Sequence, residues 1–360
     1  MLRARQHIGS LPAIVHGGLN SAGLATSAIN PENVLDFSAC CNPYGPPKQL
    51  RKAMGVTELS DYPDPNSTAL LKALAQKLSL HQENLIPGSG STEIIRMAAT
   101  AYLGPGDSAV MPSPTYSEYE LACRIVDSAV VKFILNEKDD FQLNIAAFID
   151  FAKSHHPAAI FLCNPNNPTG QYLSYDHISM ILGEFPDSLI VLDEAYIAFT
   201  DGAWSSLKLL KSPNLLIVRS MTKDYAMAGL RLGYGIAQKS IVDTLKKVRP
   251  PWNVNSPAQR AGCAALSCDD YILSCYKRID GCKHYLAGEL VKLGLNVIPS
   301  QTNFFIFQVG DAACFRSRLL EKGFLVRDCT SFGLPGFVRI SPRSMVDCRK
   351  LISAIREIRS

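Results

Sequence analysis

The chain has 360 residues, of which 36 are lysine or arginine and 32 are aspartate or glutamate, and 47% are hydrophobic. One hydrophobic core usually stops growing at about 250–300 residues, so this length predicts one large domain and one smaller domain. The near balance of charge, without a long basic run, argues against nucleic acid or an anionic membrane as a partner.

The sequence lacks the features of a membrane span, a signal peptide and a zinc site. No stretch reaches the roughly 18 uninterrupted apolar residues of a membrane span, and the first residues lack the ordered regions of a signal peptide. The eleven cysteines include no Cys-x-x-Cys pair and no Cys/His spacing of the zinc type. We therefore expect a cytoplasmic protein without a metal site. Whether Cys40 and Cys41 have a redox role stays open, although two adjacent cysteines are more often simply buried.

The first part of the chain predicts an arm followed by a strand and helices. Residues 1–35 contain Pro, Gly and Asn throughout, and a short strand is predicted at 34–38. Leucines recur at helical spacing between residues 66 and 80. A glycine- and serine-rich turn at 88–92 then opens a second apolar helix.

Short apolar runs alternate with helical segments through the middle of the chain. These runs lie at 108–111, 129–134, 158–163, 189–192, 214–218 and 234–236. Continuous apolar strands separated by helices are typical of a parallel sheet that is buried on both faces. We therefore predict an α/β fold, with a mostly parallel sheet sandwiched by helices.

The sequence Pro250-Pro251-Trp252 indicates a domain boundary, beyond which helices alternate with predicted strands at 303–308 and 338–340. This pattern predicts a smaller α+β domain at the C-terminal end. The predicted division is an N-terminal arm, a large domain and a small domain, at residues 1–35, 36–250 and 251–360. The arm and the residues near 36–45 are also candidates to pack with the small domain.

Three polar motifs each follow or finish one of the apolar runs. They are Asn164-Pro165-Asn166-Asn167-Pro168-Thr169-Gly170, Asp193-Glu194-Ala195-Tyr196 and Arg219-Ser220-Met221-Thr222-Lys223. Taken singly, Asp193 equally fits a helix N-cap, Asn167 fits a turn, and a lysine is most often a solvated charge. Because the carboxyl ends of parallel strands meet at one edge, the ordered set indicates a shared site.

Together, these motifs resemble those of fold-type I pyridoxal-phosphate enzymes, the aspartate aminotransferase superfamily, over nearly the whole chain. The resemblance implies that pyridoxal 5'-phosphate is the cofactor and that Lys223 bonds its aldehyde. It also implies that Asp193 pairs with the pyridine nitrogen, while Tyr196 and Asn167 hydrogen-bond the 3-oxygen of the ring.

The same resemblance implies where the cofactor phosphate and ring would lie. Gly90-Ser91-Thr92, at the start of a helix, would offer backbone N–H groups to the phosphate, with Ser220 and Arg231 completing the cup. Tyr116 would stack on the ring. Tyr62 matches a tyrosine that relatives extend across a dimer interface to the phosphate, which implies a homodimer.

Three further residues are implied to bind a small phosphorylated amino-acid substrate. Arg339 matches the arginine that grips the substrate α-carboxylate, and Arg327 matches a second arginine in relatives with phosphorylated substrates. His16 would lie over the site from the arm. A surface salt bridge fits Arg327 equally well, and an exposed turn fits His16 nearly as well.

Within the family, the chain most resembles threonine-phosphate decarboxylases of cobalamin biosynthesis, and then histidinol-phosphate aminotransferases. The sequences His16-Gly17-Gly18, Asn42-Pro43-Tyr44-Gly45-Pro46 and Pro251-Trp252-Asn253 favour the first group. We expect decarboxylation of O-phospho-L-threonine, or a close relative such as O-phospho-L-serine, to an amino-alcohol phosphate of the cobamide nucleotide loop. The alternative is transfer of an amino group to 2-oxoglutarate. Relatives usually carry asparagine at the position of Cys40. This difference bears on which substrate side chain the enzyme accepts.

Two other classes of function fit less well. Ser220-Met221-Thr222-Lys223 matches the Ser-x-x-Lys of serine acylases, but the Ser-Asp-Asn and Lys-Thr-Gly elements of those enzymes do not occur. A non-catalytic regulator built on the same fold would need a DNA-binding domain, for which the arm is too short. The sequence therefore predicts an enzyme.

Overall fold

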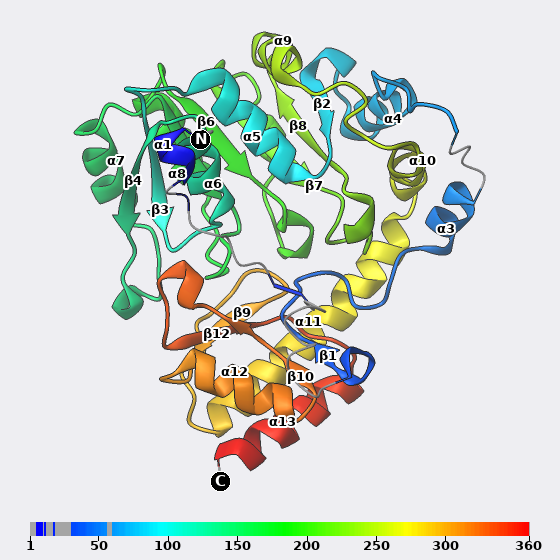
Figure 1. The fold of residues 1–360 in the computed structure, drawn as a ribbon, viewed down its shortest axis with the longest axis vertical. Coiled ribbons are helices and arrows are strands. Elements are labelled where there is room, and N and C mark those ends of the chain that lie inside the picture. The colour runs from blue at the N-terminus through cyan, green and yellow to red at the C-terminus, as the bar shows by residue number, and fades with distance from the viewer. Residues whose placement is uncertain (1–4, 10, 12–16, 19–29, 56–59, 360) are drawn as a thin grey trace, which may run out of the picture.

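A computed structural model describes residues 5–9, 11, 17–18, 30–55 and 60–359 (Figure 1). It contains a large sheet with helices on both faces and, below it in Figure 1, a smaller unit with short strands. The long helix α11 (Asp269–Lys292) leads from the first unit into the second.

The large sheet has seven strands in the order β2-β8-β7-β6-β5-β3-β4. Their bounds are β2 (Leu85–Gly88), β3 (Ser108–Ser113), β4 (Ala129–Ile134), β5 (Ala159–Cys163), β6 (Leu189–Asp193), β7 (Leu215–Ser220) and β8 (Gly233–Ala237). Strand β8 pairs antiparallel with β2 and β7, and the other neighbours pair parallel. The predicted mostly parallel α/β fold is thus confirmed.

Helices cover both faces of this sheet, and the strands are apolar on both faces as a result. Along β5, Ile160 and Leu162 face one core while Phe161 and Cys163 face the other. One face carries α4 (Thr68–Leu78), α7 (Ile145–Lys153), α8 (Tyr175–Glu184) and α10 (Ser256–Ala265). The other carries α5 (Ser91–Tyr102), α6 (Glu118–Ile125) and α9 (Lys239–Val248).

The smaller unit is built from two short sheets and three helices around a core of its own. Strands β11 (Arg327–Asp328), β12 (Phe337–Ile340) and β9 (Phe305–Gln308) form an antiparallel sheet. Strand β1 (Leu35–Asp36) pairs parallel with β10 (Phe324–Leu325). Helices α11, α12 (Ala312–Glu321) and α13 (Met345–Arg359) pack around them. No helix in the described part of the chain combines the length and apolar character of a membrane span.

Two segments bear on where the chain should be divided. Strand β1 pairs with β10 of the smaller unit, which agrees with the expectation that the arm and the residues near 36–45 are candidates to pack with the small domain. Helix α10 lies in the large unit, where Ala258 and Ala261 share a core with Leu50 of α3 (Lys48–Met54) and Leu70 of α4. We propose that the division falls between α10 and α11 rather than at residue 250.

Helix α1 (Gln6–Gly9) of the arm lies beside α6 (Figure 1). Nδ1 of His7 is 3.6 Å from Oδ2 of Asp127.

Strand β8 lies so close to the turn after β2 that only glycine fits at its first position. A Cβ on Gly233 would lie 2.5 Å from the Ser91 nitrogen and 2.8 Å from the Arg219 carbonyl oxygen. Because both neighbours are backbone atoms, a side chain there cannot be accommodated by rotating another side chain.

We therefore expect Gly233→Ala to destabilise the fold by about 1–3 kcal/mol through overpacking. The matched control is Gly183→Ala in α8, where a Cβ meets nothing within 4 Å, so the better helix propensity of alanine should stabilise the protein by up to about 1 kcal/mol. Melting temperatures of the two variants should shift in opposite directions. An unchanged value for Gly233→Ala would contradict the close approach.

Candidate active site

A cavity of about 890 Å³ opens at the carboxyl edge of the large sheet and is lined from both units. The predicted site residues that line it are Thr92, Tyr116, Asn167, Tyr196, Lys223, Arg231, Arg327 and Arg339. The motifs at the ends of β5, β6 and β7 therefore do meet, because these strands are parallel neighbours.

Asp193, the last residue of β6, is a buried carboxylate, with 2% of its surface exposed. The Tyr119 hydroxyl donates to its Oδ2 at 2.8 Å, and the Ala195 N–H donates to its Oδ1 at 3.0 Å. Burial raises the pKa of Asp193 to about 6, and these two hydrogen bonds act in the opposite direction. A carboxylate held in this way is suited to pair with a protonated ring nitrogen.

Tyr119 is a contributor that the sequence did not single out. Its ring stacks on Phe161 at 5.6 Å between centroids and meets Tyr116 edge-on at 5.5 Å. Its sequence signal, a tyrosine in an apolar helix three residues after Tyr116, is indistinguishable from that of an ordinary core residue.

Lys223 lies on the loop after β7 with its Nζ 5.7 Å from the centroid of the Tyr196 ring. Asn42 holds this loop from the other unit: its N–H donates to the Lys223 carbonyl at 2.8 Å, and its Nδ2 donates to the Asp224 carbonyl at 3.0 Å. The sequence indicated Asn42 only as part of a turn, so its role in positioning the lysine backbone was missed.

The start of α5 and Arg231 form a cradle for an anion. A Cβ on Gly90 would lie 2.6 Å from Nη2 of Arg231, so the guanidinium sits directly against the turn that begins the helix. Arg231 has a left-handed backbone (φ 57°), and its Nη1 donates to the Ala228 carbonyl at 3.2 Å. Helix N–H groups facing a guanidinium suit a phosphate.

Two pairs of neighbouring hydroxyl groups include residues that were implied to contact the cofactor. Thr92 Oγ1 is 3.3 Å from the Tyr116 hydroxyl, and Ser220 Oγ is 2.7 Å from Thr222 Oγ1. Ser220 is buried and is absent from the residues that line the main cavity. It lines a separate, smaller pocket together with Glu194 and Arg219.

Arg327 and Arg339 form a cationic wall opposite the large sheet. They are directly paired across β11 and β12, so they project from the same face. Arg339 donates from Nη1 to Asn167 Oδ1 and from Nη2 to the Ser38 carbonyl at 3.0 Å. Arg327 donates to Ser331 Oγ at 2.6 Å, and its pKa is lowered by burial and by the neighbouring Arg339 charge. This wall favours a ligand with more than one anionic group.

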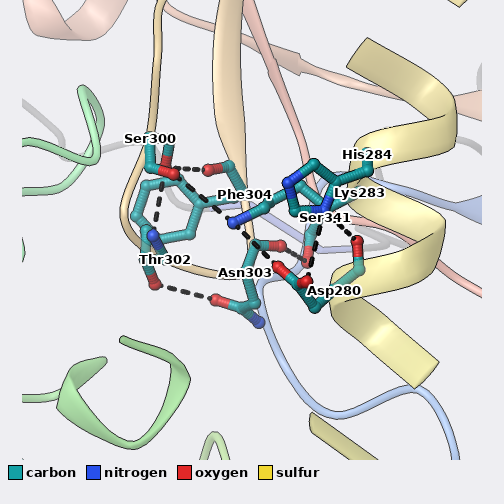
Figure 2. Close-up of polar contacts among 8 residues, drawn as sticks. All are labelled: Asp280, Lys283, His284, Ser300, Thr302, Asn303, Phe304 and Ser341. Atoms are coloured by element: carbon teal, nitrogen blue, oxygen red, sulfur yellow. Dashed lines mark hydrogen bonds and ion pairs between the residues drawn. The ribbon is translucent and has the colours of Figure 1, made fainter. Parts of the chain in front are cut away.

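The floor beneath Arg339 is fixed by a polar network between α11 and the loop before β9 (Figure 2). The Phe304 ring centroid lies 5.2 Å from the Arg339 guanidinium carbon. Around it, Lys283 pairs with Asp280 at 3.3 Å and donates to the Ser300 carbonyl at 3.4 Å. The Ser341 hydroxyl donates to the Asn303 carbonyl at 2.9 Å, tying β12 to the same loop. These contacts hold the arginine wall in place.

The other predicted site residues in the described part of the chain do not line the cavity: they are Gly90, Ser91, Asp193, Ser220 and Tyr62. Tyr62 is 78% exposed and stacks on Trp252 with 4.5 Å between ring centroids. His16 lies outside the described residues. The next two residues, Gly17 and Gly18, do line the cavity.

Comparison with known proteins identifies the family. Residues 32–355 match the family Aminotransferase class I and II. The histidinol-phosphate aminotransferase of Moorella thermoacetica is 36% identical over 91% of this chain and 86% of its own length. The adenosylcobalamin biosynthesis bifunctional protein CobDQ of Leptospira interrogans is 35% identical over 95% of this chain but only 41% of its own, longer length.

A solved structure adds a third relative. The L-threonine-O-3-phosphate decarboxylase from Porphyromonas gingivalis superimposes with a TM-score of 0.80 at 28% identity, covering 89% of this chain and 98% of that chain. The chain thus belongs to the aminotransferase class I and II family of fold-type I enzymes, and its cofactor is pyridoxal phosphate.

Proposed function

We propose that this enzyme decarboxylates a phosphorylated amino acid, O-phospho-L-threonine or a close relative such as O-phospho-L-serine. The products would be CO₂ and the amino-alcohol phosphate used in the cobamide nucleotide loop. The observation that carries the proposal is the pair Arg327 and Arg339, which face the cavity from neighbouring strands. Such a substrate has a carboxylate and a phosphate, so each arginine has an anionic partner.

The residues present fit the cofactor. Asp193 is a buried carboxylate that would pair with the ring nitrogen, and the cradle of Gly90 and Arg231 suits the phosphate. Tyr196 and Asn167 would bond the 3-oxygen of the ring. The remaining contacts are assigned to Ser91, Thr92, Tyr116 and Ser220. When bound, the cofactor withdraws electrons from the substrate Cα.

The roles of the chain's own groups follow from this placement. Lys223 would hold the cofactor covalently and, once released, its ammonium would donate a proton to Cα. In the overall reaction the bond from Cα to the carboxylate carbon breaks, CO₂ leaves, and a proton takes its place on Cα. Arg339 would orient the carboxylate, and Arg327 the phosphate.

We also propose a homodimer. Tyr62 and Trp252 form an exposed aromatic pair in a single chain, and large exposed aromatic groups of this kind are typical of interfaces. In such a dimer, Tyr62 of one copy would reach the phosphate of the cofactor in the other. The cavity of a single chain would then lack one of its phosphate contacts.

Histidinol-phosphate-type transamination with 2-oxoglutarate is the second candidate, and it is favoured by the names of several relatives, including that of Moorella thermoacetica. The same lysine, aspartate and arginines serve both reactions. Decarboxylation is supported by the decarboxylase structure, and the part of CobDQ that matches this chain supports a role in cobalamin biosynthesis.

The reaction is tested by incubating the holoenzyme with O-phospho-L-threonine, with and without 2-oxoglutarate. We expect CO₂ release that does not need 2-oxoglutarate, and no keto acid. Lys223→Ala should lower this rate by at least about 10²–10⁴-fold, since it removes the proton donor. Keto-acid formation without CO₂ would overturn the decarboxylase proposal and support transamination.

The role of Arg327 is tested by replacing it with glutamine. Loss of a charge-assisted contact to the phosphate should raise KM for O-phospho-L-threonine by about 10–100-fold. Turnover of unphosphorylated threonine, where measurable, should change little because that substrate has no phosphate to bind. Arg327→Lys is the matched control. It keeps the positive charge, so it should raise KM for O-phospho-L-threonine less than Arg327→Gln does. An equal effect on both substrates would show that Arg327 does not bind the phosphate.

A further inference from the structure

We propose that Ser38 is a positioning residue that latches the Gly17-Gly18 segment of the N-terminal arm to the anchor of Arg339. The placement of Gly17 and Gly18 at the cavity and the orientation of Arg339 would then depend on one serine. The proposal rests on the proposed function only for the identity of the carboxylate that Arg339 binds.

Ser38 is 2% exposed and is hydrogen-bonded to Arg339, Asp36 and Gly18. Its carbonyl accepts from Nη2 of Arg339 at 3.0 Å. Its hydroxyl donates to Oδ1 of Asp36 at 2.6 Å and accepts from the Gly18 N–H at 2.8 Å. A hydroxyl has a single proton. Because that proton is directed to Asp36, the lone pairs of Oγ are left facing the arm.

Ser38 is also held in the small unit by contacts that do not involve the arm. Oδ1 of Asp36 also accepts from the Ser38 N–H at 2.7 Å. Asp36 belongs to β1, and the next residue, Phe37, accepts from the Ser341 N–H at 2.9 Å. Ser38 is therefore tied to the segment that directly follows β12, the strand of Arg339.

The arm packs on the carbonyl that Arg339 uses. A Cβ on Gly17 would lie 2.7 Å from the Ser38 carbonyl oxygen and 3.4 Å from Nη2 of Arg339. Gly17 is not in the left-handed region, whereas Gly18 is (φ 110°). Substitution of Gly17 by alanine therefore tests the close contact without introducing backbone strain.

Arg339 is also poised for a further acceptor. Its Nη1 and Nη2 are bonded to Asn167 and Ser38, while its Nε is buried without a partner in the described part of the chain. Buried donors are normally satisfied, so an incoming carboxylate has a place to bind. Gly17 lies against the same guanidinium, so Gly17 and Gly18, held by Ser38, would lie beside that carboxylate.

The test compares Ser38→Ala and Gly17→Ala with the arm control Gly9→Ala, at which a Cβ meets nothing within 4 Å. Hydrogen–deuterium exchange is measured on the substrate-free holoenzyme, in a peptide that contains Gly18. We expect faster exchange in Ser38→Ala and Gly17→Ala, and wild-type exchange in Gly9→Ala. The absorbance of the bound cofactor should be unchanged in all three, because none of them is among the residues proposed to hold it.

Steady-state kinetics supply the second readout. Each of the two variants should raise KM by about fivefold, the effect of losing one typical hydrogen bond, and should change kcat much less. The double variant should be no worse than the more impaired single variant, because both break the same link. The proposal would be overturned if the KM of the double variant rose by the product of the two single effects. It would also be overturned if the Gly18 peptide of Ser38→Ala exchanged at the wild-type rate. The exchange readout needs no substrate, so a wrong assignment of the reaction leaves that test intact.

Discussion

The rest of the site depends on the burial of the Asp193 carboxylate at the end of β6. Burying a carboxylate is costly unless hydrogen bonds and a positive charge compensate. Tyr119 and the Ala195 N–H supply two hydrogen bonds, yet burial still raises the pKa of Asp193 to about 6. In the proposed assignment, a protonated ring nitrogen would supply the missing positive charge, so the family's cofactor would complete this part of the fold.

The two units contribute opposite walls, and a few contacts join them across the cavity. The large sheet provides the lysine, the aspartate and the anion cradle, while the small unit provides Arg327 and Arg339. Arg339 bonds Asn167 of the large unit, and Asn42 holds the Lys223 loop from near the small unit. A shift between the units would therefore move the proposed substrate groups relative to the proposed cofactor groups.

The sequence predicts the features that have local signals. Continuous apolar runs indicated the strands of the large sheet, although the edge strand β4 is partly exposed rather than buried, with Ile134 71% exposed. The motifs after these runs indicated the edge where they converge. A five-residue apolar run carries no direction, so the antiparallel pairing of β8 was not predictable. Tyr119, Asn42 and Ser38 act on residues 74, 182 and 301 positions away, respectively, and only the folded chain brings these partners together. The contact proposed for Tyr62 lies in a second copy of the chain.

The claim that the buried Asp193 carboxylate sets the charge of the cofactor ring is tested most directly by ¹⁵N NMR. The holoenzyme is reconstituted with cofactor labelled at the ring nitrogen, and its shift is compared between the wild type and Asp193→Asn. We predict the shift of a protonated nitrogen in the wild type near neutral pH, and that of an unprotonated nitrogen in the variant. An unprotonated nitrogen in the wild type, or the same shift in both proteins, would contradict the account.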